Sequence, residues 1–247
     1  MLGLPDGIGG CLFDLDGVLT KTATVHAAAW TQMFNAFLRD WSARTGQRLA
    51  PFDPVTDYEK YVDGKQRIDG TRSFLASRGI HLPDGREDDS PDAHTSYGLG
   101  NRKNQILQEM LASNGVETYE GSVRYVRAVR DRGLPRAVVS SSANCKEVLE
   151  VAHIEDLFEV RIDGTVAKRD HLRGKPAPDM YLAAASALGL EPAAAAVFED
   201  AVAGVESGRA GGFGYVVGVD RMGQADALRE HGADVVVKDL AELLSRS

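Results

Sequence analysis

A short apolar run that ends in two aspartates and a glycine constrains this chain more than any other stretch. Residues 8–20 read IGGCLFDLDGVLT, and such a run is typical of a strand buried on both faces of a parallel sheet. Side chains alternate along a strand, so Asp14 and Asp16 should lie on the same side at its carboxyl end. Ligands bind at that end in open α/β sheets. We therefore expect the chemistry of the protein there.

The two aspartates also limit what can bind beside them. Neighbouring carboxylates repel each other and are unfavourable to bury alone, so a hard divalent cation suits them. Gly17 lets the backbone turn sharply directly after them. An ordinary Asp-Gly turn is the alternative for either residue taken alone. An EF-hand calcium loop is excluded, because Val18 stands where that loop requires Asp or Asn and Val25 where it requires Glu.

Charge and composition exclude several classes of partner. The formal net charge of -8 argues against nucleic acid or an anionic membrane, although a metal ion and local cations still allow an anionic small substrate. The first residues lack a basic segment followed by an apolar core, and no later run is long enough to span a bilayer. We expect a cytoplasmic protein and a monomer. Cys11 and Cys145 should be buried thiols, since nothing indicates a disulfide framework.

The order of the predicted elements indicates an α/β fold with a helical insertion. Residues 22–114 show helical apolar patterns and no convincing strand alternation. Beyond them, helices alternate with short apolar strands, which is typical of a parallel sheet. We predict a Rossmann-like parallel sheet with helices on both faces, formed by residues 1–21 and 115–247. Residues 22–114 should form an inserted, all-helical cap domain.

The individual elements follow from the same patterns. Strands are predicted at 8–13, 135–140, 194–198, 215–219 and 234–237, with a short strand and turn at 161–167. Helices of the sheet domain are predicted at 121–132, 144–152, 178–188, 202–210, 223–230 and 240–244. Within the insertion, helical patterns run through 25–41, 74–75 and 99–112. Arg67 is expected on a loop, and the acidic, turn-rich stretch 83–95 should be an exposed excursion.

Polar residues collect at the predicted strand ends. Ser140 ends one strand, Glu199 and Asp200 follow another, and Lys175 lies just before a predicted helix. Each has an ordinary alternative. Ser140 would cap a helix, Lys175 would be a solvated surface lysine, and the acidic pair would be the charged start of a helix. Their joint placement with the two aspartates favours a single site.

Four motifs connect these residues to a known family. They read DLDGVLT at 14–20, VVSSS at 138–142, GKPAPD at 174–179 and FEDAVAG at 198–204. In this order they resemble the haloacid dehalogenase superfamily of phosphotransferases. Within it, the chain most closely resembles the β-phosphoglucomutase family, because residues 22–30 reproduce most of its TAxxHxxAW pattern and residues 102–104 its RKN.

The resemblance implies roles for the residues at the strand ends. Asp14 would be the nucleophile that forms an aspartyl phosphate, and Asp16 the general acid and base. Ser140 and Lys175 would hold the remaining phosphoryl oxygens. Mg²⁺ is the implied cofactor, and its ligands would be the Asp14 side chain, the Asp16 backbone carbonyl, Glu199 and Asp200.

The family also implies a substrate and the residues that bind it. The substrate would be a sugar phosphate, and the reaction the conversion of β-glucose 1-phosphate to glucose 6-phosphate through the 1,6-bisphosphate. The implied substrate-binding residues are His26, Trp30, Arg67, Lys103, Ser141, Ser142 and Asn144. The chain departs from the family at Lys21, at Ala143 and in the acidic stretch 83–95.

Two alternatives accompany this hypothesis. A sugar-phosphate phosphatase would use the same strand-end residues and needs only one phosphate site, whereas a mutase must hold a second phosphate and keep water from the aspartyl phosphate. A catalytically silent phosphate-binding module is the other. The retention of both Asp14 and Asp16 argues against it, since a pure binder gains little from a nucleophile and an acid.

Overall fold

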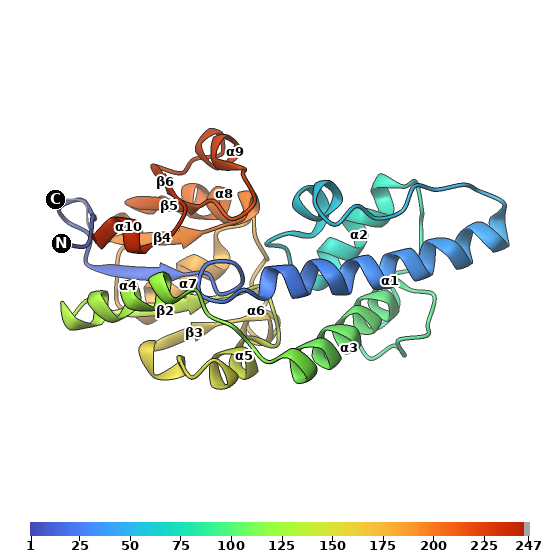
Figure 1. The fold of residues 1–247 in the computed structure, drawn as a ribbon, viewed down its shortest axis with the longest axis horizontal. Coiled ribbons are helices and arrows are strands. Elements are labelled where there is room, and N and C mark those ends of the chain that lie inside the picture. The colour runs from blue at the N-terminus through green and yellow to red at the C-terminus, as the bar shows by residue number, and fades with distance from the viewer. Residues whose placement is uncertain (245–247) are drawn as a thin grey trace. The chain divides into compact units, whose positions relative to one another are not determined.

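The computed structural model describes residues 1–244, which divide into two compact units (Figure 1). The sheet unit takes Met1–Thr22 and the chain from Val116 onward. The helical unit takes Ala23–Gly115. The functional assignment of these units as a phosphotransferase core and a cap stays a prediction.

The sheet unit contains six parallel strands in the order β3-β2-β1-β4-β5-β6. Their bounds are Gly10–Phe13 (β1), Arg136–Val139 (β2), Val160–Ile162 (β3), Ala195–Glu199 (β4), Tyr215–Val219 (β5) and Val235–Val237 (β6). In the register of the sheet, Phe13 of β1 lies opposite Val138 of β2 and Phe198 of β4. The carboxyl ends of these three central strands therefore lie side by side. The predicted fold class is confirmed.

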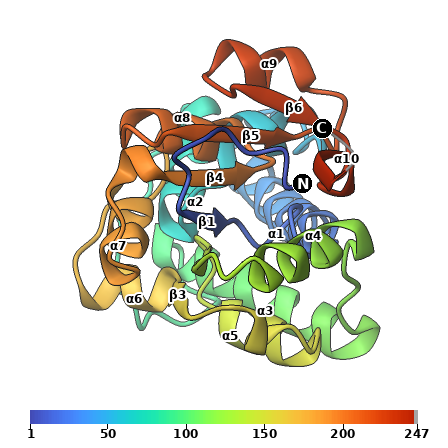
Figure 2. The same ribbon diagram turned by 90° about the vertical axis from the view of Figure 1, so that its left-hand side faces the viewer.

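Helices cover both faces of this sheet (Figure 2). The helices are α4 (Glu120–Asp131), α5 (Cys145–Val151), α6 (Gly164–Arg169), α7 (Asp179–Ala187), α8 (Val202–Ala210), α9 (Ala225–Glu230) and α10 (Ala241–Leu244). Alternation along the strands assigns the faces. Leu12 and Val197 join the apolar core beneath α7 and α8. Phe13 stacks on Phe198 with ring centroids 4.4 Å apart and packs edge-on against Tyr125 of α4, on the other face.

The helical unit has an aromatic core of its own. Its helices are α1 (Thr22–Thr45), α2 (Arg67–Ser77) and α3 (Ser96–Asn114), with a π-helical turn at Tyr58–Val62. Phe34 lies at the centre of the core, with its ring centroid 4.0 Å from that of Phe74 and 5.1 Å from that of Trp30. No strand occurs in this unit, and no helix within residues 1–244 is long and apolar enough to span a membrane.

The acidic stretch 83–95 is a loop fastened to the start of α3. The Asn101 amide donates hydrogen bonds of 2.9 Å to the carbonyls of Glu87 and Asp89. Arg102, the first residue of the RKN triplet, donates to the carbonyl of Pro91. The stretch forms neither helix nor strand and most of it is exposed, as predicted. Arg102 therefore anchors this loop.

Two local predictions were wrong. Arg67 is the first residue of α2 and does not lie on a loop, because the extended residue Gln66 starts the helix directly before it. Residues 164–169, predicted in part as a turn, form the helix α6. Asp163 starts that helix, since its side chain accepts from the backbone N–H groups of Thr165 and Val166.

Both cysteines are buried, and we expect their thiols to be inert in the folded protein. Burial raises the pKa of Cys11 to about 12 and also raises that of Cys145. Because the thiolate is the reactive form, alkylation by iodoacetamide at pH 8 should be negligible in the native protein and complete in denaturant. Mass spectrometry would detect the adducts, and rapid native labelling would contradict the expectation.

Candidate active site

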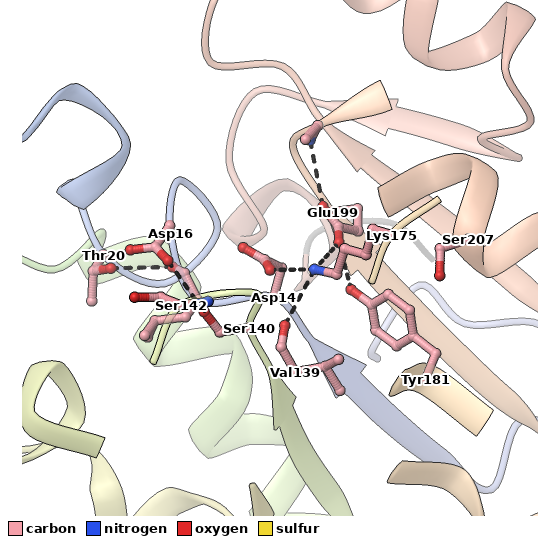
Figure 3. Close-up of polar contacts among 12 residues, drawn as sticks. Asp14, Asp16, Thr20, Val139, Ser140, Ser142, Lys175, Tyr181, Glu199 and Ser207 are labelled. Carbon is pink, nitrogen blue, oxygen red and sulfur yellow. Dashed lines mark hydrogen bonds and ion pairs between the residues drawn. The ribbon is translucent and has the colours of Figure 1, made fainter. Parts of the chain in front are cut away.

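The candidate catalytic residues lie where the central strands end (Figure 3). Asp14 follows β1 directly, Ser140 follows β2, and Glu199 is the last residue of β4. Lys175 comes from the loop before α7 and points toward the same edge. The sheet register brings these strand ends together, as the sequence predicted, and the ligand-binding edge of parallel sheets is the expected place for them.

Lys175 forms the buried centre of this group. Its Nζ lies 2.5 Å from Asp14 Oδ1 and 2.5 Å from Glu199 Oε1, and it donates to the Val139 carbonyl at 3.3 Å. Burial acts to lower the pKa of Lys175, but the two carboxylates outweigh it and raise the pKa. Burial raises the pKa of Asp14 well above its usual value, against the opposing effect of Lys175. A protonated lysine therefore offsets part of the buried negative charge.

Three buried carboxylates could hold a metal ion here. Asp14, Glu199 and Asp200 each offer one oxygen, and these oxygens lie within 4.8 Å of one another. When all three are ionised, they carry three negative charges against the one positive charge of Lys175. The two negative charges left uncompensated suit a divalent cation. Carboxylate oxygens are also the donors that Mg²⁺ takes in proteins. The residues present thus fit the implied cofactor.

Gly17 brings the backbone close to this acidic group. Its φ is +88°, a conformation that favours glycine, and a Cβ atom at this position would lie 1.7 Å from Asp200 Oδ2. Gly204 of α8 has a similar role, because a Cβ there would lie 2.0 Å from Glu199 Oε1. Any side chain at either position would displace a carboxylate of the group.

Asp16 lies beside the acidic group, and its carboxylate has different partners. Thr22 Oγ1 donates to Asp16 Oδ1, and Ser140 Oγ donates to Oδ2 at 3.3 Å. Thr20 in turn hydrogen bonds Thr22 at 2.7 Å. Asp14 thus contacts Lys175 and the acidic cluster, whereas the Asp16 carboxylate contacts hydroxyl groups. Coordination of a metal by the Asp16 carbonyl stays a prediction.

Two serines after β2 each accept a hydrogen bond from the backbone N–H two residues further along the chain. Ser140 Oγ accepts from the backbone N–H of Ser142 at 3.1 Å. Ser142 Oγ accepts from the N–H of Asn144 at 3.2 Å, directly before α5. These turns fix the orientation of the loop that leaves β2. The roles of Ser141, Ser142 and Asn144 in binding substrate stay predictions.

Three of the predicted substrate-binding residues meet within the helical unit. Lys103 is buried, with its Nζ 3.1 Å from His26 Nδ1 and 5.0 Å from the ring centroid of Trp30. An ammonium group only donates, so His26 Nδ1 must accept here. Burial lowers the pKa of Arg67, opposed by the charge of Glu87, and its side chain passes close to Gly100 of α3. This unit thus holds two partly desolvated cations.

Sequence reasoning missed two contacts of the site. The Tyr181 hydroxyl donates to Glu199 Oε1 at 2.7 Å from the first turn of α7. Its position in the helix that follows Lys175 was the available signal. Thr22 lies at the start of α1, where a threonine commonly caps a helix, but its hydroxyl holds the Asp16 carboxylate. No local pattern distinguishes these uses of a threonine.

Fold and site together define an α/β enzyme with a buried aspartate, lysine and metal-type acidic cluster at the carboxyl edge of a parallel sheet. The family model of haloacid dehalogenase-like hydrolases matches residues 8–212. The chain therefore belongs to the haloacid dehalogenase-like hydrolase family and is an enzyme. The alternative of a catalytically silent module falls with this assignment.

Named relatives refine the comparison. The chain is 55% identical over 247 residues to "Beta-phosphoglucomutase" of Mycobacterium tuberculosis, covering 99% of this chain and 94% of that protein. It is 31% identical over 235 residues to "Hexitol phosphatase A" of Escherichia coli, covering 95% of this chain and 92% of that protein. A crystal structure of a Clostridium difficile β-phosphoglucomutase shares the fold, with a TM-score of 0.72, 23% identity and coverage of 96% and 93%.

Proposed function

We propose that this enzyme is a Mg²⁺-dependent phosphomutase that converts β-glucose 1-phosphate to glucose 6-phosphate. The reaction would pass through an aspartyl phosphate and glucose 1,6-bisphosphate. The observation that carries the proposal is the 55% identity to the mycobacterial β-phosphoglucomutase along nearly the whole chain. The buried centre around Asp14 is consistent with that chemistry. A monomer in the cytoplasm remains the expectation, with no nucleic acid or membrane partner.

Asp14 would act as the nucleophile. Its oxygen would attack the C1 phosphorus of glucose 1,6-bisphosphate, and the bond to the C1 oxygen would break as glucose 6-phosphate leaves. The phosphoryl group would stay on the carboxylate until the C6 hydroxyl of β-glucose 1-phosphate takes it, which forms the bisphosphate again. Lys175 lies against Asp14 and would hold a phosphoryl oxygen as charge spreads in the transition state, with Ser140 holding another. Asp16 would give a proton to the departing sugar oxygen and later take one from the attacking hydroxyl.

The metal proposal uses the same acidic cluster. Asp14, Glu199 and Asp200 would hold Mg²⁺, together with the Asp16 carbonyl. When bound, Mg²⁺ supplies positive charge that offsets the repulsion between the carboxylates and the phosphate. Tyr181 would fix the orientation of Glu199 for this purpose, because its hydroxyl bonds one carboxylate oxygen.

The helical unit would bind the rest of the substrate. Arg67 and Lys103 are cations removed from water and would bind the phosphate that is not reacting. His26 and Trp30 pack with Lys103 and would orient it. From the sheet unit, Ser141, Ser142 and Asn144 would add hydrogen-bond donors. A second phosphate site is needed by a mutase and not by a simple phosphatase.

A coupled assay tests the proposal. With Mg²⁺ and a trace of glucose 1,6-bisphosphate, β-glucose 1-phosphate should yield glucose 6-phosphate, which glucose 6-phosphate dehydrogenase reports as NADPH. The α anomer should give a rate lower by about 100-fold or more, since an inverted anomeric oxygen is misplaced for attack. Chelation of Mg²⁺ should remove the activity. Equal rates on both anomers would contradict the proposed specificity.

A sugar-phosphate phosphatase is the second candidate, and the 31% identity to hexitol phosphatase A supports it. It would use the same aspartates, with water taking the phosphoryl group from Asp14. Release of inorganic phosphate from several sugar phosphates, without glucose 6-phosphate formation from β-glucose 1-phosphate, would favour this candidate over the mutase. The measured ratio of transfer to hydrolysis separates the two.

A further inference from the structure

The loop that leaves β5 fastens the loop that carries Asp16. Arg221 Nε donates to the Gly17 carbonyl at 2.8 Å, and its Nη2 lies 3.4 Å from the Val18 carbonyl. Its Nη1 donates to the carbonyl of Lys238 at 2.6 Å. The guanidinium of Arg221 thus connects the carbonyls of Gly17 and Val18, which follow Asp16, to the carbonyl of Lys238, which directly follows β6.

The guanidinium is itself held in place. It stacks on the ring of Tyr119 at 3.5 Å from the centroid, and Nη2 donates to Ser122 Oγ at 3.3 Å. Its side chain is 11% exposed, with Asp239 3.7 Å away. A planar group with several fixed donors suits such a role, and a lysine ammonium would not reproduce it. The contacts leave Arg221 little freedom to release the loop.

The held loop is a closed turn with Asp16 at its base. The Gly17 N–H donates to the Thr20 carbonyl at 2.8 Å, and the Thr20 N–H donates to the Leu15 carbonyl at 3.0 Å. Val18 is fully buried. Removal of the arginine would leave carbonyls of this turn without a partner in a largely dry environment, and the turn would rearrange to regain one.

We propose that Arg221 is a positioning residue that fixes the Asp16 carboxylate for proton transfer. The inference rests on the proposed function, in which Asp16 protonates the departing sugar oxygen. Arg221 holds the carbonyl of Gly17, the residue directly after Asp16. Loss of Arg221 therefore displaces Asp16 rather than Asp14. A displacement of about 1 Å can reduce the rate of a step about 100-fold.

A second contact of the same loop makes the test demanding. Gln224 donates to the backbone carbonyl of Asp200 at 2.9 Å, and Gly17 packs against the Asp200 side chain. If loss of Arg221 disturbed these contacts, Asp200 would shift and the acidic cluster would bind a metal ion less tightly. The experiment must therefore separate an effect on Asp16 from an effect on metal binding and from general loss of stability.

Leaving-group dependence provides that separation. In Arg221→Met, the first turnover would be followed as release of glucose 6-phosphate from glucose 1,6-bisphosphate and of 4-nitrophenolate from 4-nitrophenyl phosphate. In both, the Asp14–phosphorus bond forms and the ester P–O bond breaks. The sugar oxygen needs the Asp16 proton, whereas 4-nitrophenolate leaves without it. We expect a loss of about 100-fold on the sugar phosphate and less than about 3-fold on the aryl phosphate.

Three further variants make the result decisive. Arg209→Met removes an arginine that ties the Gly232 carbonyl and Asp234 far along the chain from Asp16, and it should change neither rate. Arg221→Lys replaces the Met variant if that variant does not fold, and should show the same dependence to a smaller degree. Asp16→Asn tests the proposed function by itself. Whatever the role of Arg221, this variant should lose far more rate on the sugar phosphate than on the aryl phosphate.

The outcomes are distinct. Equal losses on both substrates in Arg221→Met would overturn the inference and assign Arg221 a structural role. Mg²⁺ should raise the melting temperature of Arg221→Met as it does that of the wild type. If it does not, the inference is also overturned, because Arg221 would then act on metal binding through Asp200. If Asp16→Asn shows no selectivity, the acid role in the proposed function fails first. Selectivity in Asp16→Asn without selectivity in Arg221→Met refutes the inference alone.

Discussion

Replacing Asp14 by asparagine should reduce turnover by about 10⁴-fold or more. An amide at this position is too poor a nucleophile to accept the phosphoryl group, while its size and its hydrogen-bonding oxygen are retained. Asp14→Asn also removes one charge from the buried acidic cluster. Steady-state formation of glucose 6-phosphate, measured at saturating β-glucose 1-phosphate and Mg²⁺, gives the effect.

Stability measurements accompany that result. The variant should fold, because loss of one carboxylate relieves repulsion with Glu199 and Asp200 while Lys175 keeps Glu199 as a partner. Beryllium fluoride, a mimic of the aspartyl phosphate, should raise the melting temperature of the wild type and leave that of Asp14→Asn unchanged. As a matched control, Asp131→Asn changes an exposed aspartate of α4 and should behave as wild type. Full turnover by Asp14→Asn would refute the nucleophile assignment.

The sheet could be predicted from the sequence because its signal is local. Each central strand is a short apolar run, and helices with apolar stripes separate them, so the alternation itself indicates parallel pairing. Strand ends were predicted to within about one or two residues. The turn around Asp163 was harder, because the aspartate that starts α6 serves equally well in a plain turn.

The site was predictable only as far as strand ends define it. Asp14, Ser140 and Glu199 follow from the rule that polar residues at carboxyl ends of neighbouring strands share an edge. Tyr181 and Arg221 lie outside that rule, because their partners are 18 and more than 200 residues away along the chain. Such contacts depend on how helices and loops pack over the sheet, which periodicity does not encode.

Loss of the buried cation at position 175 should lower stability most. Lys175→Met leaves Asp14 and Glu199 without the ammonium that lies 2.5 Å from each. Removing one partner of a buried ion pair costs about 3–5 kcal/mol, because the remaining charge stays desolvated. Urea unfolding in the absence of metal measures the free energy of unfolding. Tyr181→Phe, which removes only a hydroxyl from Glu199, should cost about 1 kcal/mol.

The pH dependence of the stability lost in Lys175→Met tests whether that loss is electrostatic. The pKa of Asp14 is already raised above 3.8 by burial, and loss of the lysine removes the main group that lowers it. At Asp14 the folded state then binds more protons than the unfolded state above about pH 4, so the contribution of this carboxyl to stability is greatest at low pH and falls as pH rises. The deficit relative to wild type should therefore shrink between pH 8 and pH 5, and Mg²⁺ should offset part of it at pH 8, since it supplies the missing positive charge. A deficit that does not change with pH or with Mg²⁺ would show that Lys175 acts by packing, and the assignment of a charged centre at this sheet edge would have to be abandoned.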